Sequence, residues 1–501
     1  MINLKKSAIL LGIAVVCTEG FVACDDDDEF SAIHQLPTTS NNDNQQTNNG
    51  YEKTDLLEAN RFVYEVMSTY YYWVDEMPHL NYRQESDTEN YFYKLLSSKD
   101  RFSFISNDAE AEAESDQGIA TSKGWLYTLA RMGTDTIAAI IKYTYAGSPS
   151  RNADVRRGDL LIKVDDELMT AKNYSTLMSK TSGKYTFLRY DAEKDELVSV
   201  EKEFSNAKII ENPVAETCIL NTESGTKVGY LLYNSYKSAF NEYLTEAAKT
   251  FAAEDVKDVI LDIRYNQGGE LEACRHLCSL LAPKDVVKEG KELLFYEFNS
   301  ILSEIDGYSR QNYSETFMNE LEEYNLNLNK LVVLTGGNSY SASEATIWGL
   351  KPYMDITTVG DTTGGKNSMM FVLTPEDFVD NNENPYYSST INNWYMAPIV
   401  AVYKNSTGVS FDTSNGYGLT PDVYVDEFSS LRKGSLGEIG TTSDPLTAAA
   451  LKYIDNGYSV DGNKSLQQPA EKVSEIVSGG FNGRGGAMVY PKNKFKIKNF
   501  K

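Results

Sequence analysis

The stretch VVLTGGNSYSASE, residues 332–344, has the pattern of a buried strand that runs through a glycine turn into a helix. Ser341 stands at that turn, where a hydroxyl is exposed above the sheet and lies at the positive end of the helix dipole. Such a position favours a developing alkoxide, which is typical of a nucleophile. A second interpretation stays open, because Ser341 and Glu344 also have the S-x-x-E spacing of a helix capping box.

The sequence on both sides of this stretch alternates strand and helix patterns. This alternation predicts a largely parallel sheet covered by helices, with functional loops at the carboxyl ends of the strands. The predicted strands are residues 228–233, 258–263, 331–335 and 356–359, and the predicted helices are residues 238–253, 270–281 and 343–350.

Two neighbouring strand ends carry further chemistry. VILDIRYNQGG, residues 259–269, ends in a glycine pair that opens a helix, where free backbone amides favour an anion or an oxyanion. TVGDTTGGK, residues 358–366, ends in Lys366. No histidine follows His276, so a serine nucleophile here needs another base. A lysine can serve if burial lowers its pKa from about 10.4 toward neutrality, which corresponds to about 4 kcal/mol of differential solvation.

These three motifs and GLTPD at residues 418–422 resemble those of the carboxyl-terminal processing proteases, the S41 serine peptidases. The resemblance covers roughly residues 51–455. It implies a crotonase-like, ClpP-like α/β protease core over residues 206–455. The fold class expected for the whole chain is therefore α/β, with a PDZ β domain and a small N-terminal helical module added to that core.

The resemblance also implies a role for each motif. Ser341 is the implied nucleophile, and Lys366, 25 residues further along, is the implied base. The amides of Ala342 and Gly268 are the implied oxyanion hole. No cofactor or metal is expected, since the chain contains three histidines, and Cys274 and Cys278 at helical spacing are better explained as small core residues.

Residues 116–205 have short β-rich runs broken by turn residues. The segment AGSPSRNADVRRGDLLIKVD, residues 146–165, resembles part of a PDZ domain. Such a domain binds an extended peptide as an added strand and holds its carboxylate in backbone amides. The resemblance implies that the carboxylate loop lies at Gly118, Ile119 and Ala120. A purely structural or gating PDZ domain stays open.

Apolar residues at helical spacing predict a small helical module over residues 51–115, beginning near Asp55. Residues 1–23 have the charged, apolar and small-residue regions of an export signal. The segment ending at Cys24 resembles a bacterial lipobox and implies lipidation of that cysteine. Residues 24–50 are expected to be an acidic, Asn-rich tether, and residues 456–501 a C-terminal tail.

The charge balance excludes one class of partner. The chain has 47 Lys and Arg against 72 Asp and Glu, a net charge of −25, whereas nucleic-acid binding needs a basic surface. The acidic run at residues 25–29 resembles a surface-export signal of some Gram-negative lipoproteins. The protein is expected in the bacterial cell envelope, anchored in the outer membrane, and exposure on the cell surface is a further hypothesis. Membrane contact is expected only through a lipid at Cys24. The sequence predicts no oligomeric state.

Two competing interpretations remain. Residues 360–366, GDTTGGK, have the G-x-x-x-x-G-K spacing of a phosphate-binding loop, but Asn367 replaces the required Ser or Thr, and a strand pattern follows where a helix is needed. The stronger rival is a catalytically weak or inactive peptide-binding lipoprotein on the same fold. Met370, where the family often has glutamine, and Ala120 favour it.

The function that these patterns favour is an exported, lipid-anchored serine endopeptidase. It would hydrolyse peptide bonds of proteins or peptides with a Ser341–Lys366 dyad, through an acyl-enzyme.

Overall fold

The computed structural model describes residues 53–459, except 133–134, 306, 415 and 434–435, and also residues 475–479, 487–489 and 495–496. The predicted export signal, the lipidation at Cys24 and the tether over residues 24–50 lie outside the described residues. Within the described part, no helix combines the length and the apolar character that crossing a bilayer requires.

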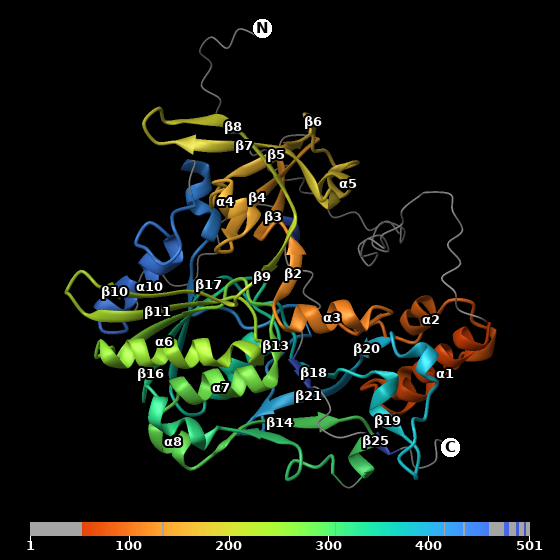
Figure 1. Cartoon of the computed structure of the whole chain (residues 1–501). Coiled ribbons are helices and arrows are strands. Elements are labelled where there is room, and N and C mark those ends of the chain that lie inside the picture. Colours follow the sequence, from red (N-terminus) through yellow and green to blue (C-terminus); the bar gives the residue numbers. More distant parts are fainter. Residues whose placement is uncertain are drawn as a thin grey trace, which may run out of the picture.

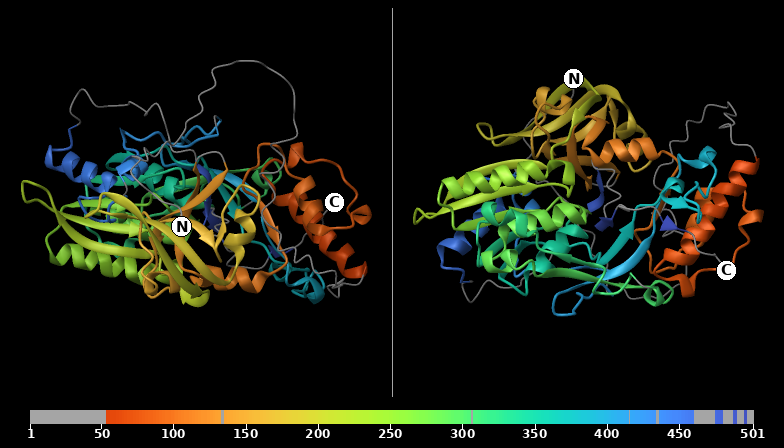
Figure 2. Two further views of the ribbon diagram at one scale, coloured as in Figure 1. Left: turned by 90° about the horizontal axis from the view of Figure 1, so that it is seen from above. Right: turned by 60° about the horizontal axis from the view of Figure 1, so that its bottom comes forward.

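The N-terminal part of the described chain is helical, as its periodicity predicts. Helix α1 buries Phe62, Val63 and Val66 along one face, and α2 begins at the N-cap Asp87, whose side chain accepts the N–H of Asn90. These helices lie at one side of the molecule in Figures 1 and 2. The elements are α1 (Lys53–Tyr70), α2 (Thr88–Lys94), β1 (Phe104–Ser106) and α3 (Ala109–Asp116).

A separate antiparallel sheet follows, in the order β23-β3-β4-β5-β7-β8 with β6 on β5. Its core contains Trp125, Ile141, Leu161 and Phe187. The elements are β3 (Trp125–Met132), β4 (Thr136–Thr144), α4 (Pro149–Asn152), β5 (Leu160–Val164), β6 (Glu167–Leu168), α5 (Tyr174–Ser179), β7 (Ser182–Asp191), β8 (Glu196–Ser205) and β23 (Glu475–Gly479).

Two antiparallel strands connect this sheet to the rest of the chain. They are β2 (Ile119–Ser122) and β9 (Ala207–Ile210), paired from Ile119 with Ile210 to Ser122 with Ala207. In Figure 1 they lie between the sheet at the top and the helices below it. The chain therefore enters and leaves the sheet side by side.

The central sheet has the order β10-β11-β12-β16-β17-β22, and every pair except β10 with β11 is parallel. The predicted parallel sheet is confirmed. Its elements are β10 (Val214–Asn221), β11 (Lys227–Tyr233), α6 (Asn241–Ala253), β12 (Asp258–Asp262), α7 (Leu271–Leu281), β16 (Lys330–Thr335), α9 (Ala342–Leu350), β17 (Asp355–Gly360), β22 (Val423–Tyr424) and α10 (Pro445–Asp455).

Alternate residues of the central strands face two different cores. Leu261 and Val333 pack with α6 and α7, whereas Ile260 and Val332 pack with Leu446 and other residues of α10. Strands buried on both faces read as continuous apolar runs, which is the pattern at residues 258–263 and 331–335. The result is a three-layer α/β/α arrangement.

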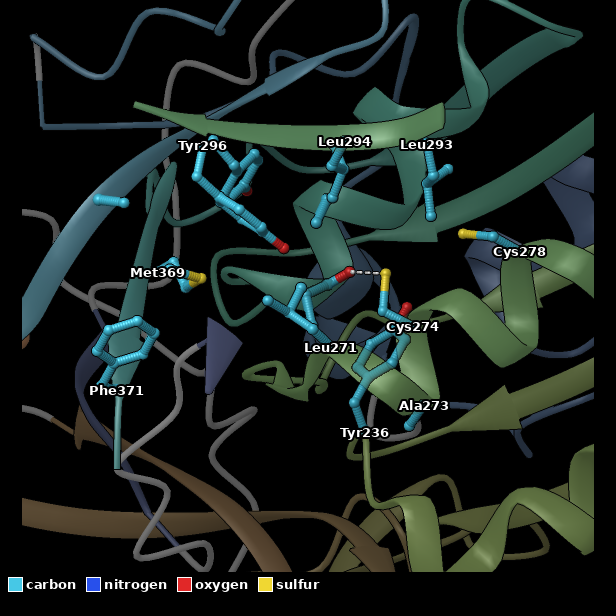
Figure 3. Close-up of a cluster of buried hydrophobic side chains, with 14 of the residues drawn as sticks. Tyr236, Leu271, Ala273, Cys274, Cys278, Leu293, Leu294, Tyr296, Met369 and Phe371 are labelled. Atoms are coloured by element: carbon cyan, nitrogen blue, oxygen red, sulfur yellow. Dashed lines mark hydrogen bonds between the residues drawn. The ribbon is translucent and has the colours of Figure 1, made fainter. Parts of the chain in front are cut away.

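A second, mixed sheet has the order β13-β24-β18-β21-β14-β15, and the sequence patterns predicted only one of its strands, the run that follows Lys366. It packs against α7 and α9. Figure 3 shows Cys274 and Cys278 of α7 pointing toward Leu293, Leu294 and Tyr296 of β14. The elements are β13 (Gly269–Glu270), α8 (Lys284–Lys288), β14 (Glu292–Phe298), β15 (Ser314–Thr316), β18 (Ser368–Phe371), β19 (Phe378–Val379), β20 (Tyr395–Ala397), β21 (Ile399–Asn405), β24 (Ala487–Val489) and β25 (Phe495–Lys496).

The segment expected to be a C-terminal tail thus contributes strands to the fold. β23 joins the first sheet, β24 joins the second sheet, and β25 pairs with β19. Short runs such as AMV, residues 487–489, carry no clear periodicity of their own. Their extended form depends on the neighbouring strands to which they pair.

Candidate active site

Ser341 lies at the sharp turn between β16 and α9. Its backbone has φ 55° and ψ −109°, a conformation that a residue with a side chain adopts only at a cost of about 1–3 kcal/mol. A serine on a strained strand-to-helix turn is the geometry of a nucleophile elbow. The Ser341 hydroxyl is buried and makes no hydrogen bond to any described residue. The Glu344 side chain nevertheless accepts the Ser341 N–H, so Ser341 is the N-cap of α9 and one half of the capping box that the S-x-x-E spacing allowed is present.

Glu344 connects the Ser341 turn to the loop that carries Lys366. Its Oε2 atom accepts the backbone N–H groups of Ser341 and Lys366 at 2.9 and 2.8 Å. Its Oε1 atom accepts the N–H of Gly365 at 2.9 Å and the hydroxyl of Thr363. Burial raises the pKa of this carboxyl, and the hydrogen bonds that it accepts offset only part of that increase. The fully buried side chain of Glu344 thus holds the Ser341 turn and the Lys366 loop in a fixed relative position.

Tyr403 of β21 makes the same connection from another side. Its hydroxyl lies 3.1 Å from the carbonyl oxygen of Ser341 and 3.0 Å from that of Lys366. The ring is fully buried. Together, Tyr403 and Glu344 bring the backbones of the two predicted catalytic residues to the same place.

Lys366 is buried, with a relative exposure of 1%. Burial lowers the pKa of its amine to about 7, against smaller opposing effects of Asp100 and Glu344. Its Nζ lies 3.2 Å from the Sδ of Met370 and 4.9 Å from the centre of the Phe102 ring. A sizeable fraction of this lysine is therefore neutral near pH 7, as a base requires.

Gly268 lies against the Ser341 turn. A Cβ atom at this position would lie 3.0 Å from the Ala342 nitrogen and 3.0 Å from the Ser341 Cβ, and the backbone φ is +98°. Only glycine fits so close an approach with this backbone. The Gly268 N–H donates to the Asn266 Oδ1 at 2.9 Å. The structure thus brings Gly268 and Ala342 together at Ser341, with the Gly268 amide held by a side chain.

Three predicted peptide-binding residues lie elsewhere. Ile119 and Ala120 belong to β2 and pair with β9, and the Gly118 N–H donates to the carbonyl of Ser115. These residues connect the first sheet to the core, so the structure does not bring them to the Ser341 turn. No group of metal-ligating side chains occurs within the described residues.

The histidines of the described chain are not close partners of the site. His276 is buried on α7 and its Nε2 lies 2.8 Å from the Thr245 hydroxyl, while burial lowers its pKa to about 4. His79 is exposed in the N-terminal part. The segment after Lys366 is β18 and not a helix, which removes the phosphate-binding loop as an interpretation.

Sequence patterns did not assign a role to Tyr403, Phe102 or Asn266, and they assigned Glu344 only a capping role. Asn266 accepts the Ser343 hydroxyl through its carbonyl at 2.7 Å, while its side chain binds Gly268. A signal existed for Asn266 and Glu344, because both lie inside the glycine-rich motifs. Tyr403 and Phe102 lie in segments without a distinctive motif.

Comparisons with known proteins agree with this geometry. Residues 227–425 match the model of peptidase family S41, and residues 58–104 match the model of the peptidase S41 N-terminal domain. A Staphylococcus aureus (strain bovine RF122 / ET3-1) protein named "Probable CtpA-like serine protease" is 22% identical over 449 residues, which is 84% of this chain and 76% of the relative. The carboxy-terminal processing protease CtpA of Bacillus subtilis (strain 168) is 22% identical over 324 residues, 64% of this chain and 62% of the relative.

The fold is also similar to a solved structure. A crystal structure assigned to the S41 proteases, from Bacteroides fragilis NCTC 9343, has a TM-score of 0.61 and 25% identity, and the match covers 80% of this chain and 98% of that one. The site and these matches define a serine-type peptidase. The chain contains a peptidase family S41 domain and a peptidase S41 N-terminal domain.

Proposed function

We propose that the protein is an exported, lipid-anchored endopeptidase that cleaves peptides or proteins with a Ser341–Lys366 dyad. One observation carries the dyad. Glu344 binds the backbone amides of both residues, so the backbone of a buried lysine with a pKa of about 7 is held near that of a strained serine, whose hydroxyl makes no hydrogen bond to the described residues. This pairing supplies a base and a nucleophile without histidine.

In the proposed mechanism, neutral Lys366 takes the proton of the Ser341 hydroxyl as its oxygen attacks a peptide carbonyl. The amides of Ala342 and Gly268 stabilise the oxyanion, which requires the Gly268 N–H to leave Asn266 or to share it with the substrate. Protonated Lys366 then gives its proton to the leaving amine. Water hydrolyses the acyl-enzyme, with Lys366 acting again as base and then as acid.

The remaining parts of the proposal concern domains and location. The antiparallel sheet β3–β8 supports a PDZ domain over residues 116–205, and the three-layer core supports a crotonase-like protease core. The export signal, lipidation at Cys24 and a cell-envelope location rest on the sequence of residues 1–29 alone. Peptide binding at Gly118, Ile119 and Ala120 stays a prediction.

The dyad is tested by purified Ser341→Ala and Lys366→Ala variants acting on labelled unfolded casein. Each variant should lose at least about 1,000-fold in rate, because each acts on the same proton transfer. Ser389→Ala and Lys351→Ala are matched controls, since both parent residues are exposed, and they should keep the parental rate. A Ser341→Ala variant as active as the parent contradicts the nucleophile. Peptide affinity without turnover by the parent favours the binding-only alternative.

A further inference from the structure

Strand β23 occupies the edge of the first sheet. Residues 475–479 pair antiparallel with β3, from Glu475 opposite Ala130 to Gly479 opposite Tyr127. In the sheet order β23 is terminal, so β3 would be the edge strand without it. An edge strand presents a row of backbone N–H and C=O groups that another extended chain can pair with.

The surroundings of β3 favour a peptide strand at this edge. Leu129 of β3 and Leu177 of α5 belong to one apolar cluster. The Lys123 amine donates to the carbonyls of Met178 and Lys180, and thereby ties the start of β3 to the end of α5. A sheet edge beside a helix is a known arrangement for peptide binding by strand addition, in which backbone hydrogen bonds supply much of the affinity.

Strand β24 lies directly beside the candidate active site. It pairs parallel with β13 through Gly269 and Ala487, and parallel with β18 through Met369 and Ala487. β13 begins immediately after Gly268, and β18 begins two residues after Lys366. Ala487 therefore lies between the glycine-pair loop and the strand that follows the lysine, opposite a residue of each.

Without β24, a space one strand wide would separate β13 from β18. Adjacent strands lie about 4.8 Å apart, so β13 and β18 are held roughly 9.6 Å apart, which is the width that one extended chain needs. A peptide whose carbonyl is attacked by Ser341 has to pass the same loop, because Gly268 and Ala342 lie at that serine. The space between β13 and β18 accepts the backbone of any sequence, as a protease substrate site requires.

We propose that β23 and β24 occupy, within the same chain, two places on the path of a peptide substrate, so that the protein is self-blocked until a substrate displaces them. This proposal rests on the proposed function. β24 has three residues, and a hydrogen bond contributes about 1 kcal/mol net, so the contact is weak enough to be displaced. A tethered segment nevertheless competes at an effective concentration of about 1 mM.

A third contact holds the same segment. β25 pairs with β19, and the ring of Phe495 stacks on Phe378 at 5.3 Å and lies 5.3 Å from the Tyr70 ring of α1. This contact lies outside the candidate active site. It therefore offers a way to loosen the segment without altering β24 itself.

The test uses the full chain with Met488→Pro and the matched control Met488→Leu. Met488 is the middle residue of β24 and has a strand on each side, so proline removes a paired N–H whichever side it faces. Casein hydrolysis by Met488→Pro should be at least about 10-fold faster than by the parent, because the tethered competitor is lost. Met488→Leu should behave as the parent. A synthetic peptide of residues 471–491 should return the Met488→Pro rate to the parental value.

A Met488→Pro variant that is folded but no faster than the parent overturns the proposal. If that variant does not fold, Phe495→Ala replaces it, and an unchanged rate there also overturns the proposal. Fluorescence anisotropy of the labelled 471–491 peptide on the Ser341→Ala/Met488→Pro protein needs no turnover. If the peptide binds the double variant more tightly than it binds Ser341→Ala alone, self-blocking is supported even when no variant cleaves casein. If the parent cleaves casein but the two affinities are equal, the peptidase activity stands and self-blocking is rejected.

Discussion

At the scale of single residues, the chemistry of the site depends on how Lys366 is surrounded. Its burial lowers the pKa of the amine to about 7, while Asp100 and Glu344 oppose that shift. Met370 places a thioether sulfur 3.2 Å from the amine, where many family members are expected to have a glutamine. A thioether is a weak acceptor, so it does little to favour the charged form. The neutral form that the proposed mechanism needs is therefore set mainly by exclusion of water.

This surrounding predicts the pH dependence of the peptidase. Only neutral Lys366 can accept the Ser341 proton, so kcat/KM should rise with pH and level off above a midpoint near pH 7. Below that midpoint the rate should fall tenfold for each pH unit. Initial rates on a fluorogenic peptide between pH 5 and 9 measure the curve. A midpoint near pH 10, or a flat profile, contradicts Lys366 as the base.

At the scale of elements, the N-terminal helical module takes part in the site. The segment between α2 and β1 lies over the Lys366 loop, where the Arg101 guanidinium donates to the carbonyl of Gly365 at 3.0 Å. The Phe102 ring covers the Lys366 amine and makes an edge contact with Tyr340. The module that matches the S41 N-terminal domain therefore helps to exclude water from the proposed base.

Phe102→Ala tests this role. Loss of the ring admits water to Lys366, so its pKa should rise toward 10.5, and the acid limb of kcat/KM should move up by about one pH unit. The rate at pH 9 should change much less than the rate at pH 6. Leu57→Ala on the exposed face of α1 is the control and should leave the profile unchanged. An identical shift in both variants would mean that Phe102 acts only through general stability.

At the scale of the whole molecule, buried charges join the first sheet to the core. The Arg157 guanidinium donates to the carbonyls of Lys142 and Gly437 and pairs with Glu427 at 2.8 Å and Asp444 at 3.4 Å. Asp444 also binds Arg264, which lies on the loop that leads to Gly268. The position of the sheet is thus coupled to the loop of the glycine pair through charged groups that are almost fully buried.

Arg157→Met should destabilise the protein by about 3–5 kcal/mol, because it leaves Glu427 and Asp444 buried with one cation fewer. The neighbouring Arg156→Met is the matched control. Arg156 pairs with Asp154 at the surface, so its loss should cost less than about 1 kcal/mol. Urea unfolding followed by tryptophan fluorescence measures both values. An equal decrease in the free energy of unfolding in the two variants would show that the buried Arg157 network stabilises the protein no more than a surface ion pair does.

The sequence by itself determined the central fold and predicted the two residues that we propose as nucleophile and base. Buried parallel strands read as apolar runs, so β11, β12, β16 and β17 could be predicted. The roles of Ser341 and Lys366 were predicted because the glycine turns at the strand ends resemble S41 motifs. Local patterns also explain the one ambiguity, since the spacing of Ser341 and Glu344 fits a capping box as well as a catalytic turn.

Only the tertiary structure decided how these parts meet. Glu344, Tyr403 and Phe102 act on Lys366 and Ser341 from separate elements, and burial of an amine depends on neighbours that no periodicity reveals. Strands β23 and β24 pair with residues that precede them by more than one hundred positions, and such short strands are extended only because a sheet edge or gap is present. Long-range pairing and exclusion of water are properties of the folded chain, so the pKa of the proposed base and the proposed self-blocking contact could not be derived from residue order.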